Sequence, residues 1–179
     1  MAVVASYRFD DPAGAVGIET MLVRAGDGPT YQVPLCYRGA PLDDGDRWLI
    51  GNTAHSVLGK RWVYDGCGDP VYVSTLASAI FGETRQADEF FEVDGAQERR
   101  ERTIAVTGSG GPGGRGGAAP TVAPPCHVVD GDPTLIVADA VQLAVIRRLG
   151  DDHGPAEATL TGTWGGRPDP LPLAYATLR

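Results

Sequence analysis

The histidines and cysteines are the side chains best suited to chemistry in this 179-residue chain, yet their spacing matches no catalytic or metal-binding motif. His55, His127 and His153 have no recognisable base or metal partner in the sequence, and no Gly-x-Ser-x-Gly nucleophile motif occurs. Cys126 directly precedes His127, whereas the ligands of a structural zinc site are separated by intervening residues. The sequence therefore predicts no catalytic residues, no metal ligands and no bound cofactor.

Two further segments resemble ligand-binding loops only in composition. Residues 108–117 read GSGGPGGRGG, but a phosphate-binding loop needs a Gly-Lys-Ser/Thr step at the start of a helix, and Arg115 is followed by glycines. Residues 43–46 read DDGD and lack the glycine and glutamate positions of a calcium-binding loop. We interpret the first segment as a flexible linker and the second as a solvated turn.

Several aromatic side chains and one histidine are the remaining candidates for a binding surface. The histidine is either a structural residue or a functional one, since no base or metal partner is indicated for it. The aromatic residues form either a platform that stacks on a carbohydrate ring or an ordinary part of the core. The candidates for a ligand or partner surface are Trp48, His55, Trp62, Tyr64 and Tyr72, with Trp164 as a further aromatic residue.

The overall charge argues against nucleic-acid binding. Lys plus Arg number 15 and Asp plus Glu number 23, and the resulting net charge of -8 repels a phosphate backbone. No apolar run is long enough to span a membrane, and the first residues lack the basic start of a signal peptide. The three cysteines are too scattered for a disulfide framework. We therefore expect a cytoplasmic protein with reduced thiols that binds neither nucleic acid nor membrane.

Apolar patterning predicts mainly short antiparallel strands. In the first half we expect a strand at 5–9, a hairpin at 17–37 and a strand at 60–64, with Pro34 at a sheet edge or a bulge. The polar stretch 83–102 is expected to be exposed, with Phe90, Phe91 and Val93 anchoring it to a sheet edge. In the second half the expected strands are 134–138, 142–149, 158–164 and 171–178.

One helix is predicted over residues 69–81. Asp69 is a good N-cap, Pro70 suits the first helical position, and Gly82 ends the apolar spacing. The fold class is therefore α+β. We divide the chain into residues 1–105 as a first subdomain, 106–125 as a Gly/Pro-rich flexible linker and 126–179 as a second, small antiparallel β subdomain.

Four motifs in the first half resemble the N-terminal cap domain of actinobacterial maltokinases. They are YQVPLCYRGAP at 31–41, AHSVLG at 54–59, RWVYD at 61–65 and DPVYV at 69–73. The resemblance implies a curved antiparallel sheet with one helix laid across it, an arrangement described as cystatin-like. It also implies that residues 126–179 correspond to the small lobe of a protein kinase.

The same resemblance implies that the kinase machinery is missing. Ala144 stands where the family places its ATP-contacting lysine, and an alanine methyl group cannot pair with phosphates. Residues 150–157 are too few for the helix whose glutamate holds that lysine, and the chain reaches Arg179 about where the catalytic lobe would begin. We therefore expect a non-enzymatic protein with no autonomous kinase activity.

Two functions lead at this stage, beside a third, an enzyme with an acid/base set that only the geometry of the fold could group. The first is a non-catalytic binding or regulatory module that docks on a maltokinase-like enzyme, or on another enzyme of glucan and trehalose metabolism, or that self-associates through a sheet edge. The second is a small-molecule or sugar-binding domain that uses a groove on the concave cap sheet, with Trp48 or Trp62 stacking on the ring.

Overall fold

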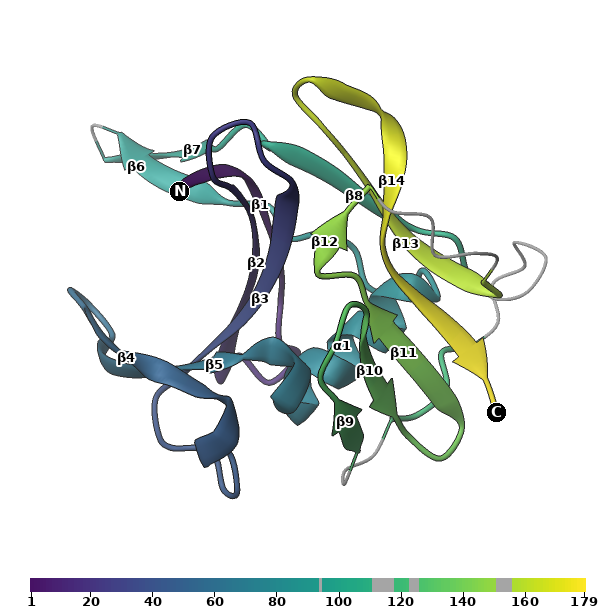
Figure 1. Ribbon diagram of the computed structural model, residues 1–179. Helices are drawn as coiled ribbons and strands as arrows, with labels where there is room; N and C mark the ends of the chain where they lie inside the picture. Colours follow the sequence, from purple (N-terminus) through teal and green to yellow (C-terminus); the bar gives the residue numbers. More distant parts are fainter. Residues whose placement is uncertain (94, 111–117, 123–125, 151–155) are drawn as a thin grey trace.

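The computed structural model describes residues 1–93, 95–110, 118–122, 126–150 and 156–179 (Figure 1). Much of the predicted linker at 106–125 lies outside these ranges, as does the middle of the 150–157 segment. Within the described part, no helix is both long and apolar enough to cross a membrane. The architecture is α+β, with two six-stranded antiparallel sheets, a separate two-stranded hairpin and one α-helix.

The first sheet, sheet A, is built almost entirely from the N-terminal part of the chain. Side chains along β2 (Val16–Arg24) and β3 (Thr30–Arg38) alternate between buried and partly exposed positions, so one face of the sheet is turned to the core. This confirms the predicted strand at 5–9, the hairpin at 17–37 and the strand at 60–64. In spatial order the strands are β1 (Ala2–Phe9), β2 (Val16–Arg24), β3 (Thr30–Arg38), β5 (Gly59–Asp65) and β4 (Leu49–His55), and β12 (Arg148–Leu149) also pairs with β3.

The prediction for Pro34 is wrong, because it lies in a central strand. Pro34 pairs with Thr20 of β2 without a register shift. On the other side of β3, β12 pairs with Thr30 and Tyr31 and β5 pairs from Leu35 onward, which leaves a gap at Pro34. Because the backbone N–H groups alternate in direction and that of Gln32 points to this side, the missing N–H of Pro34 falls in the gap and costs no ladder bond.

The α-helix of the described residues, α1 (Pro70–Ile80), lies within one residue of the predicted bounds 69–81 at each end. The Asp69 side chain caps it by accepting from the Val71 N–H, and Pro70 occupies the first turn. Only Ser74 is exposed along its length. Figure 1 shows the reason, because α1 lies between sheet A and the second sheet and is covered from both sides.

The second sheet, sheet C, combines the C-terminal strands with one strand from before the glycine-rich segment. Its order is β8 (Ile104–Gly108), β13 (Ala158–Trp164), β14 (Arg167–Leu178), β11 (Val141–Val145), β10 (Thr134–Val137) and β9 (His127–Val129). This confirms the strands predicted at 134–138, 158–164 and 171–178, although β14 starts earlier than expected. The strand predicted at 142–149 is instead two strands, β11 in sheet C and β12, which pairs with β3 of sheet A. The predicted boundary between residues 105 and 106 falls inside β8, a strand that sequence reasoning missed.

The sheet-edge anchor predicted at Phe90, Phe91 and Val93 is wrong, although the Ala87 N–H of the same stretch donates to the Arg8 carbonyl of the edge strand β1, at 2.9 Å. β6 (Phe90–Val93) and β7 (Ala96–Arg99) instead pair with each other in a separate hairpin. Phe90 and Phe91 are 58% and 41% exposed, because no larger sheet covers them. The hairpin projects beside the N-terminal end of β1 in Figure 1.

The two sheets share one hydrophobic core and one buried polar junction. Gln32 of β3 donates from Nε2 to the carbonyl oxygens of Ile146 and Leu173, each at 2.9 Å, and its Oε1 accepts from the Tyr7 hydroxyl. The core cluster includes Leu22 of sheet A, Leu76 of α1 and Leu143 of sheet C. The two halves of the chain are therefore joined by both apolar packing and hydrogen bonds.

Candidate functional site

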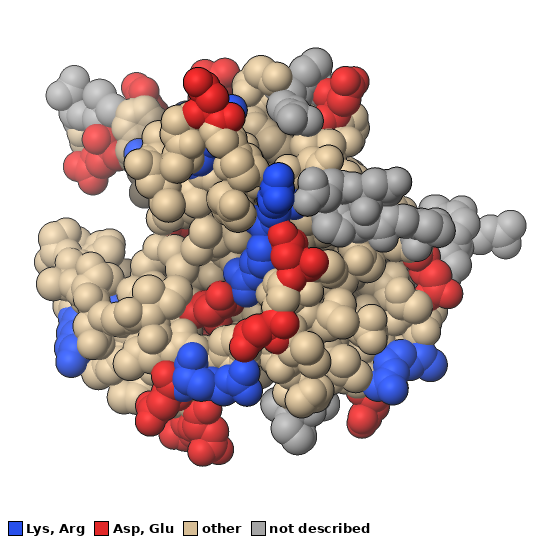
Figure 2. All heavy atoms as spheres, viewed as in Figure 1, with Lys and Arg blue, Asp and Glu red and all other residues tan. Residues whose placement is uncertain are grey.

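The concave face of sheet A is the side that turns away from α1. In Figure 1 the strands β1 to β3 bend around this side, and the β4–β5 and β6–β7 hairpins project on either side of it. Figure 2 shows the same side of the molecule as hollowed. Pairing across the sheet places one set of side chains on this face, and we use the name concave face for its apolar and aromatic members: Met21, Val23, Tyr31, Val33, Leu35, Tyr37 and Val63. Ser6, Arg8 and Glu19 lie on the same side of the sheet, with Glu19 directly opposite Leu35.

These seven side chains are all apolar or aromatic, and none of them is buried. Tyr31 is 42% exposed and the others are partly exposed. Val3, at the edge of the same face and paired with Val23, is 58% exposed. A cluster of exposed apolar side chains of this kind marks a candidate site of interaction.

A groove of about 730 Å³ occupies the β4–β5 end of the concave face. Its floor includes Tyr37 and Glu19 from β3 and β2, and its walls include the β1–β2 turn and the tip of the β4–β5 hairpin. Arg8, His55 and Arg61 line it as well. The groove thus combines the end of an apolar sheet face with charged groups of both signs.

The phenol of Tyr37 is held in its neutral form at the floor of the groove. Burial and the adjacent Glu19 carboxylate raise the pKa of Tyr37 to about 12. The hydroxyl therefore donates to Glu19 Oε2, at 3.2 Å. Because a neutral phenol that donates to a carboxylate is no general base at neutral pH, this pair provides recognition rather than catalysis.

The β1–β2 turn that forms one wall is fixed by Asp11. Burial raises the pKa of this carboxyl group, but the backbone N–H groups of Ala13, Val16 and Ala15 donate to it and bring its pKa below the ordinary value. The carboxylate is thus occupied by its own turn. It holds the wall in place and is not free for a ligand.

Of the five predicted site residues, His55 is the one that lines this groove. It is exposed at the end of β4, and its Nδ1 accepts from the N–H groups of Val57 and Leu58, at 3.2 Å each. These bonds close the turn of the β4–β5 hairpin. His55 therefore has a structural role, and its other ring nitrogen remains available at the groove.

The two predicted tryptophans lie outside the concave face. Trp62 pairs with Arg38 and Asn52 and so projects from the opposite face of sheet A, where the Lys60 ammonium lies 4.6 Å from the ring centroid. Trp48 packs against Gly68, where a Cβ would overlap the indole, and it lines a separate cavity of about 280 Å³. Neither ring is placed to stack on a ligand in the groove.

The two predicted tyrosines belong to the core. Tyr64 and Tyr72 are each 1% exposed. The Tyr64 hydroxyl accepts from the Leu42 N–H, at 2.9 Å, and burial raises the pKa of Tyr72 well above its ordinary value. Of the two interpretations of the aromatic residues, a stacking platform or part of the core, the second therefore applies to Tyr64 and Tyr72.

Two partly buried ion pairs fix the loop between β5 and α1 against the rest of the molecule. Arg38 donates from Nε and Nη2 to the Asp69 carboxylate, at 2.6 and 2.7 Å. Arg147, just after β11, donates from Nη2 to both oxygens of Asp65, at 3.0 and 2.9 Å, and contacts Cys67 Sγ at 3.2 Å. The first pair holds the start of α1 against β3, and the second joins sheet A to the segment that leaves sheet C.

The described cysteines lack the features of an activated nucleophile. Cys36 and Cys67 are buried, and burial raises the pKa of both thiols. Burial also raises the pKa of Cys126. Among the residues that the structure describes, no three His, Cys, Asp or Glu side chains are grouped so that they could hold a metal ion.

Ala144 lies in the middle of sheet C. It is 1% exposed and pairs with Leu135 of β10 and Tyr175 of β14. The position at which the family resemblance expects a phosphate-contacting lysine therefore carries a small buried methyl group.

The sequence hypothesis of a groove on the concave cap sheet relied on Trp48 or Trp62 and did not identify the apolar residues that form this face. The signal was present in residues 31–37, YQVPLCY, where apolar side chains occur at both alternating positions rather than at one. A strand that is apolar on both faces is covered on both, or it presents one apolar face to a partner.

Comparison with known proteins identifies one family. A search of curated proteins finds no match. The family described as the maltokinase N-terminal cap domain matches residues 1–69, a segment that contains the first five strands of sheet A and ends at the residue that caps α1. Residues 1–69 of this chain therefore match the maltokinase N-terminal cap domain family, which is the family that the sequence motifs indicated.

Proposed function

We propose that this protein is a non-catalytic binding module that docks on another protein through the concave face of sheet A. The observation that carries the proposal is the set of seven apolar or aromatic side chains on that face, all of them at least partly exposed. Packing the two sheets around α1 covers the opposite face of sheet A and leaves this one open. An interface with an apolar centre and a charged rim would fit the concave face with Arg8, Glu19 and Arg61 at its end.

The proposed partner is a maltokinase-like enzyme, or another enzyme of glucan and trehalose metabolism. The match of residues 1–69 to the cap domain family supports this choice, because it relates sheet A to a domain of maltokinases. The proposed role is regulatory: the module occupies a surface of the enzyme and changes its activity without adding catalytic groups.

The absence of autonomous kinase activity is part of the proposal. Ala144 supports it, because a buried methyl group inside a sheet supplies no charge for phosphoryl transfer. Incubating the full chain with ATP, Mg²⁺ and maltose tests this directly. We expect no release of ADP above that of a blank, and turnover that rises with protein concentration would contradict it.

The docking proposal is tested with purified maltokinase from the same organism. Binding is measured by calorimetry, and the maltokinase kcat and KM are measured with and without the module. We expect saturable binding together with a change in kcat or KM. Leu35→Lys and Val63→Lys place a charge on the concave face, and the long lysine side chain lets the ammonium reach water without unfolding the strand. Each variant should weaken binding by about 30-fold or more, as expected for the centre of an interface.

The matched controls are Val129→Lys and Leu178→Lys, at exposed apolar positions in sheet C. They add the same charge away from the concave face and should leave binding unchanged. Equal loss in all four variants would show that charge alone matters and would contradict the docking face. No binding and no kinetic effect with a folded module would contradict the partner.

A further inference from the structure

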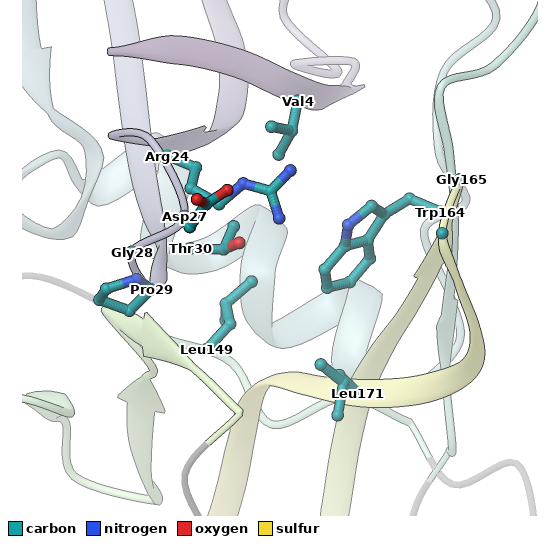
Figure 3. A pocket seen from close by; sticks show the side chains of 11 residues that line it. Val4, Arg24, Asp27, Gly28, Pro29, Thr30, Leu149, Trp164, Gly165 and Leu171 are labelled. Carbon is teal, nitrogen blue, oxygen red and sulfur yellow. The ribbon is translucent and has the colours of Figure 1, made fainter.

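A second cavity lies where the ends of the two sheets meet, apart from the groove on the concave face. It has a volume of about 300 Å³, and Figure 3 shows its lining. The cavity is lined by the N-terminal part of β1, the end of β2 with the β2–β3 turn, β12 and the β13–β14 turn. Its principal side chains are Val4, Arg24, Asp27, Thr30, Leu149 and Trp164.

Two irregularities in strand pairing occur at this cavity. The register of β1 on β2 shifts between Val3 and Ala5, so Val4 is the extra residue. The register of β13 on β14 shifts between Gly162 and Trp164. A bulge turns a side chain out of the regular alternation, and both shifts occur at residues that line the cavity.

The cavity has one apolar side and one polar side. Trp164, Leu149 and Leu171 form the apolar part. Figure 3 shows the indole of Trp164 and the guanidinium of Arg24 pointing into the space from opposite sides, with Asp27 and Thr30 on the same side as Arg24. This arrangement suits a small ring that has an apolar face and a polar edge.

The polar groups of the cavity are not engaged elsewhere in the described part of the chain. No hydrogen bond or ion pair within it uses the Arg24 guanidinium, the Asp27 carboxylate or the indole N–H of Trp164. The guanidinium offers donors, the carboxylate offers acceptors, and the Thr30 hydroxyl offers both. Because one positive and one negative group face the same small space, their charges largely offset each other, and a ligand with a net charge of either sign gains little net attraction there.

We propose that this cavity binds one ring of a neutral cyclic polyol, that is, a pyranose or a cyclitol. The ring face packs on the Trp164 indole, and neighbouring hydroxyl groups accept from Arg24 and donate to Asp27. This inference is independent of the docking proposal, because it uses no residue of the concave face. It differs from the sugar site expected from the sequence, which relied on Trp48 or Trp62.

The test uses the full chain and the indole N–H signals of its three tryptophans in a proton–nitrogen NMR spectrum. Trp48→Phe and Trp62→Phe assign two signals, and elimination assigns Trp164 even if a change at that position prevents folding. The probes are methyl α-D-glucopyranoside and myo-inositol, titrated up to about 50 mM because isolated monosaccharide sites are weak. We expect a saturable shift of the Trp164 signal alone with at least one probe, and the two titrations decide between pyranose and cyclitol.

Variants on the polar side supply the second readout. Arg24→Met and Asp27→Asn each remove charged hydrogen bonds to the ring and should weaken the titration by about tenfold. Arg8→Met and Asp10→Asn make the same changes of charge at the groove on the concave face and should have no effect. Glucosamine and glucuronate, which carry opposite charges, should bind no more tightly than the neutral probes.

Three outcomes would overturn the proposal. The first is the absence of a saturable shift with either neutral probe. The second is an equal shift of all three indole signals, which indicates a bulk effect of the solute. The third is an unchanged titration in Arg24→Met and Asp27→Asn. None of these outcomes bears on maltokinase binding, so the two proposals fail separately.

Discussion

At the scale of single residues, the Asp69 carboxylate does two things at once. It caps α1 through the Val71 N–H and forms a two-point ion pair with Arg38. Its side chain is fully buried, whereas that of Arg38 is 20% exposed. A buried carboxylate is tolerated only while it is paired. Arg38 therefore stabilises the fold mainly by compensating the buried negative charge of Asp69, and less through its own packing contacts.

We predict that Arg38→Met lowers the free energy of unfolding by about 3 kcal/mol, because it leaves a buried charge without a partner. Asp69→Asn keeps an oxygen for the cap. The double variant Arg38→Met/Asp69→Asn should therefore be more stable than Arg38→Met alone. Urea unfolding at pH 7 measures all three. A double variant no more stable than the single one would show that the arginine contributes through its own packing.

The Asp11 carboxylate gives a prediction about pH. Its pKa is lowered in the folded state, so its ionisation stabilises the protein above the pKa of the unfolded chain and this contribution is lost as the pH falls through the folded pKa. Asp11→Asn should cost about 1 kcal/mol at pH 7, a small value because the group is largely solvated. The cost should shrink below about pH 4. Urea unfolding between pH 7 and pH 3 tests this, and a cost that is constant with pH would mean that ionisation is irrelevant.

At the scale of elements, the C-terminal end of α1 is set by how closely β8 approaches it. A Cβ at Gly108 would overlap the carbonyl oxygen of Ala79. Close by, the Gly110 N–H donates to the Ile80 carbonyl, at 3.2 Å. The helix end is thus satisfied by backbone from β8 and the residues that follow it, which requires a residue without a side chain at 108.

Gly108→Ala should therefore destabilise the protein by about 3 kcal/mol, because the clash is with backbone and no side chain can move aside. Gly51→Ala is the matched control, since Gly51 is a β4 residue with open space around the added methyl group and no positive φ. Thermal unfolding of both variants gives the comparison. Equal stability of the two would contradict the close approach of β8 to α1.

The elements that sequence reasoning predicted well carry their own local signals. The bounds of α1 follow from Asp69, Pro70 and Gly82, and the hairpin of β2 and β3 from its apolar strands and turn residues. The errors arose where a neighbouring strand determines the local structure. Pro34 is tolerated in a central strand because β12 and β5 leave a gap there, and β8 is a strand because β13 pairs with it. Neither neighbour is visible in the local sequence.

The candidate sites were less predictable than the fold for the same reason. The concave face needs only the alternation along β2 and β3, and the sequence contains that pattern. The second cavity needs two register shifts and a turn from the other end of the chain, so Trp164 could be recognised as aromatic but not placed. Tyr64 and Tyr72 share the aromatic signal and are core residues.

At the scale of the whole molecule, the junction between the sheets decides whether the protein unfolds in one step or two. Gln32 bonds to residues 114 and 141 positions later in the chain, and both of its acceptors are buried. Arg147 adds the ion pair with Asp65 across the same junction. With a shared core as well, neither sheet keeps its burial when the other unfolds. We therefore predict a single cooperative transition, although the sequence suggested two subdomains.

Tryptophan fluorescence can follow each sheet separately. Trp164→Phe leaves Trp48 and Trp62, which report on the N-terminal part, and Trp48→Phe/Trp62→Phe leaves Trp164 in sheet C. Each variant should give one urea midpoint for fluorescence and circular dichroism alike. Adding Gln32→Leu removes the Gln32 donor from the Ile146 carbonyl and the Gln32 acceptor from the Tyr7 hydroxyl, while the Leu173 carbonyl keeps its bond from the Ile146 N–H. It should lower the unfolding free energy by about 3 kcal/mol in both variants. A midpoint that moves for one sheet only would mean that each sheet is stable without the other, and the junction would then be a contact between two independent domains.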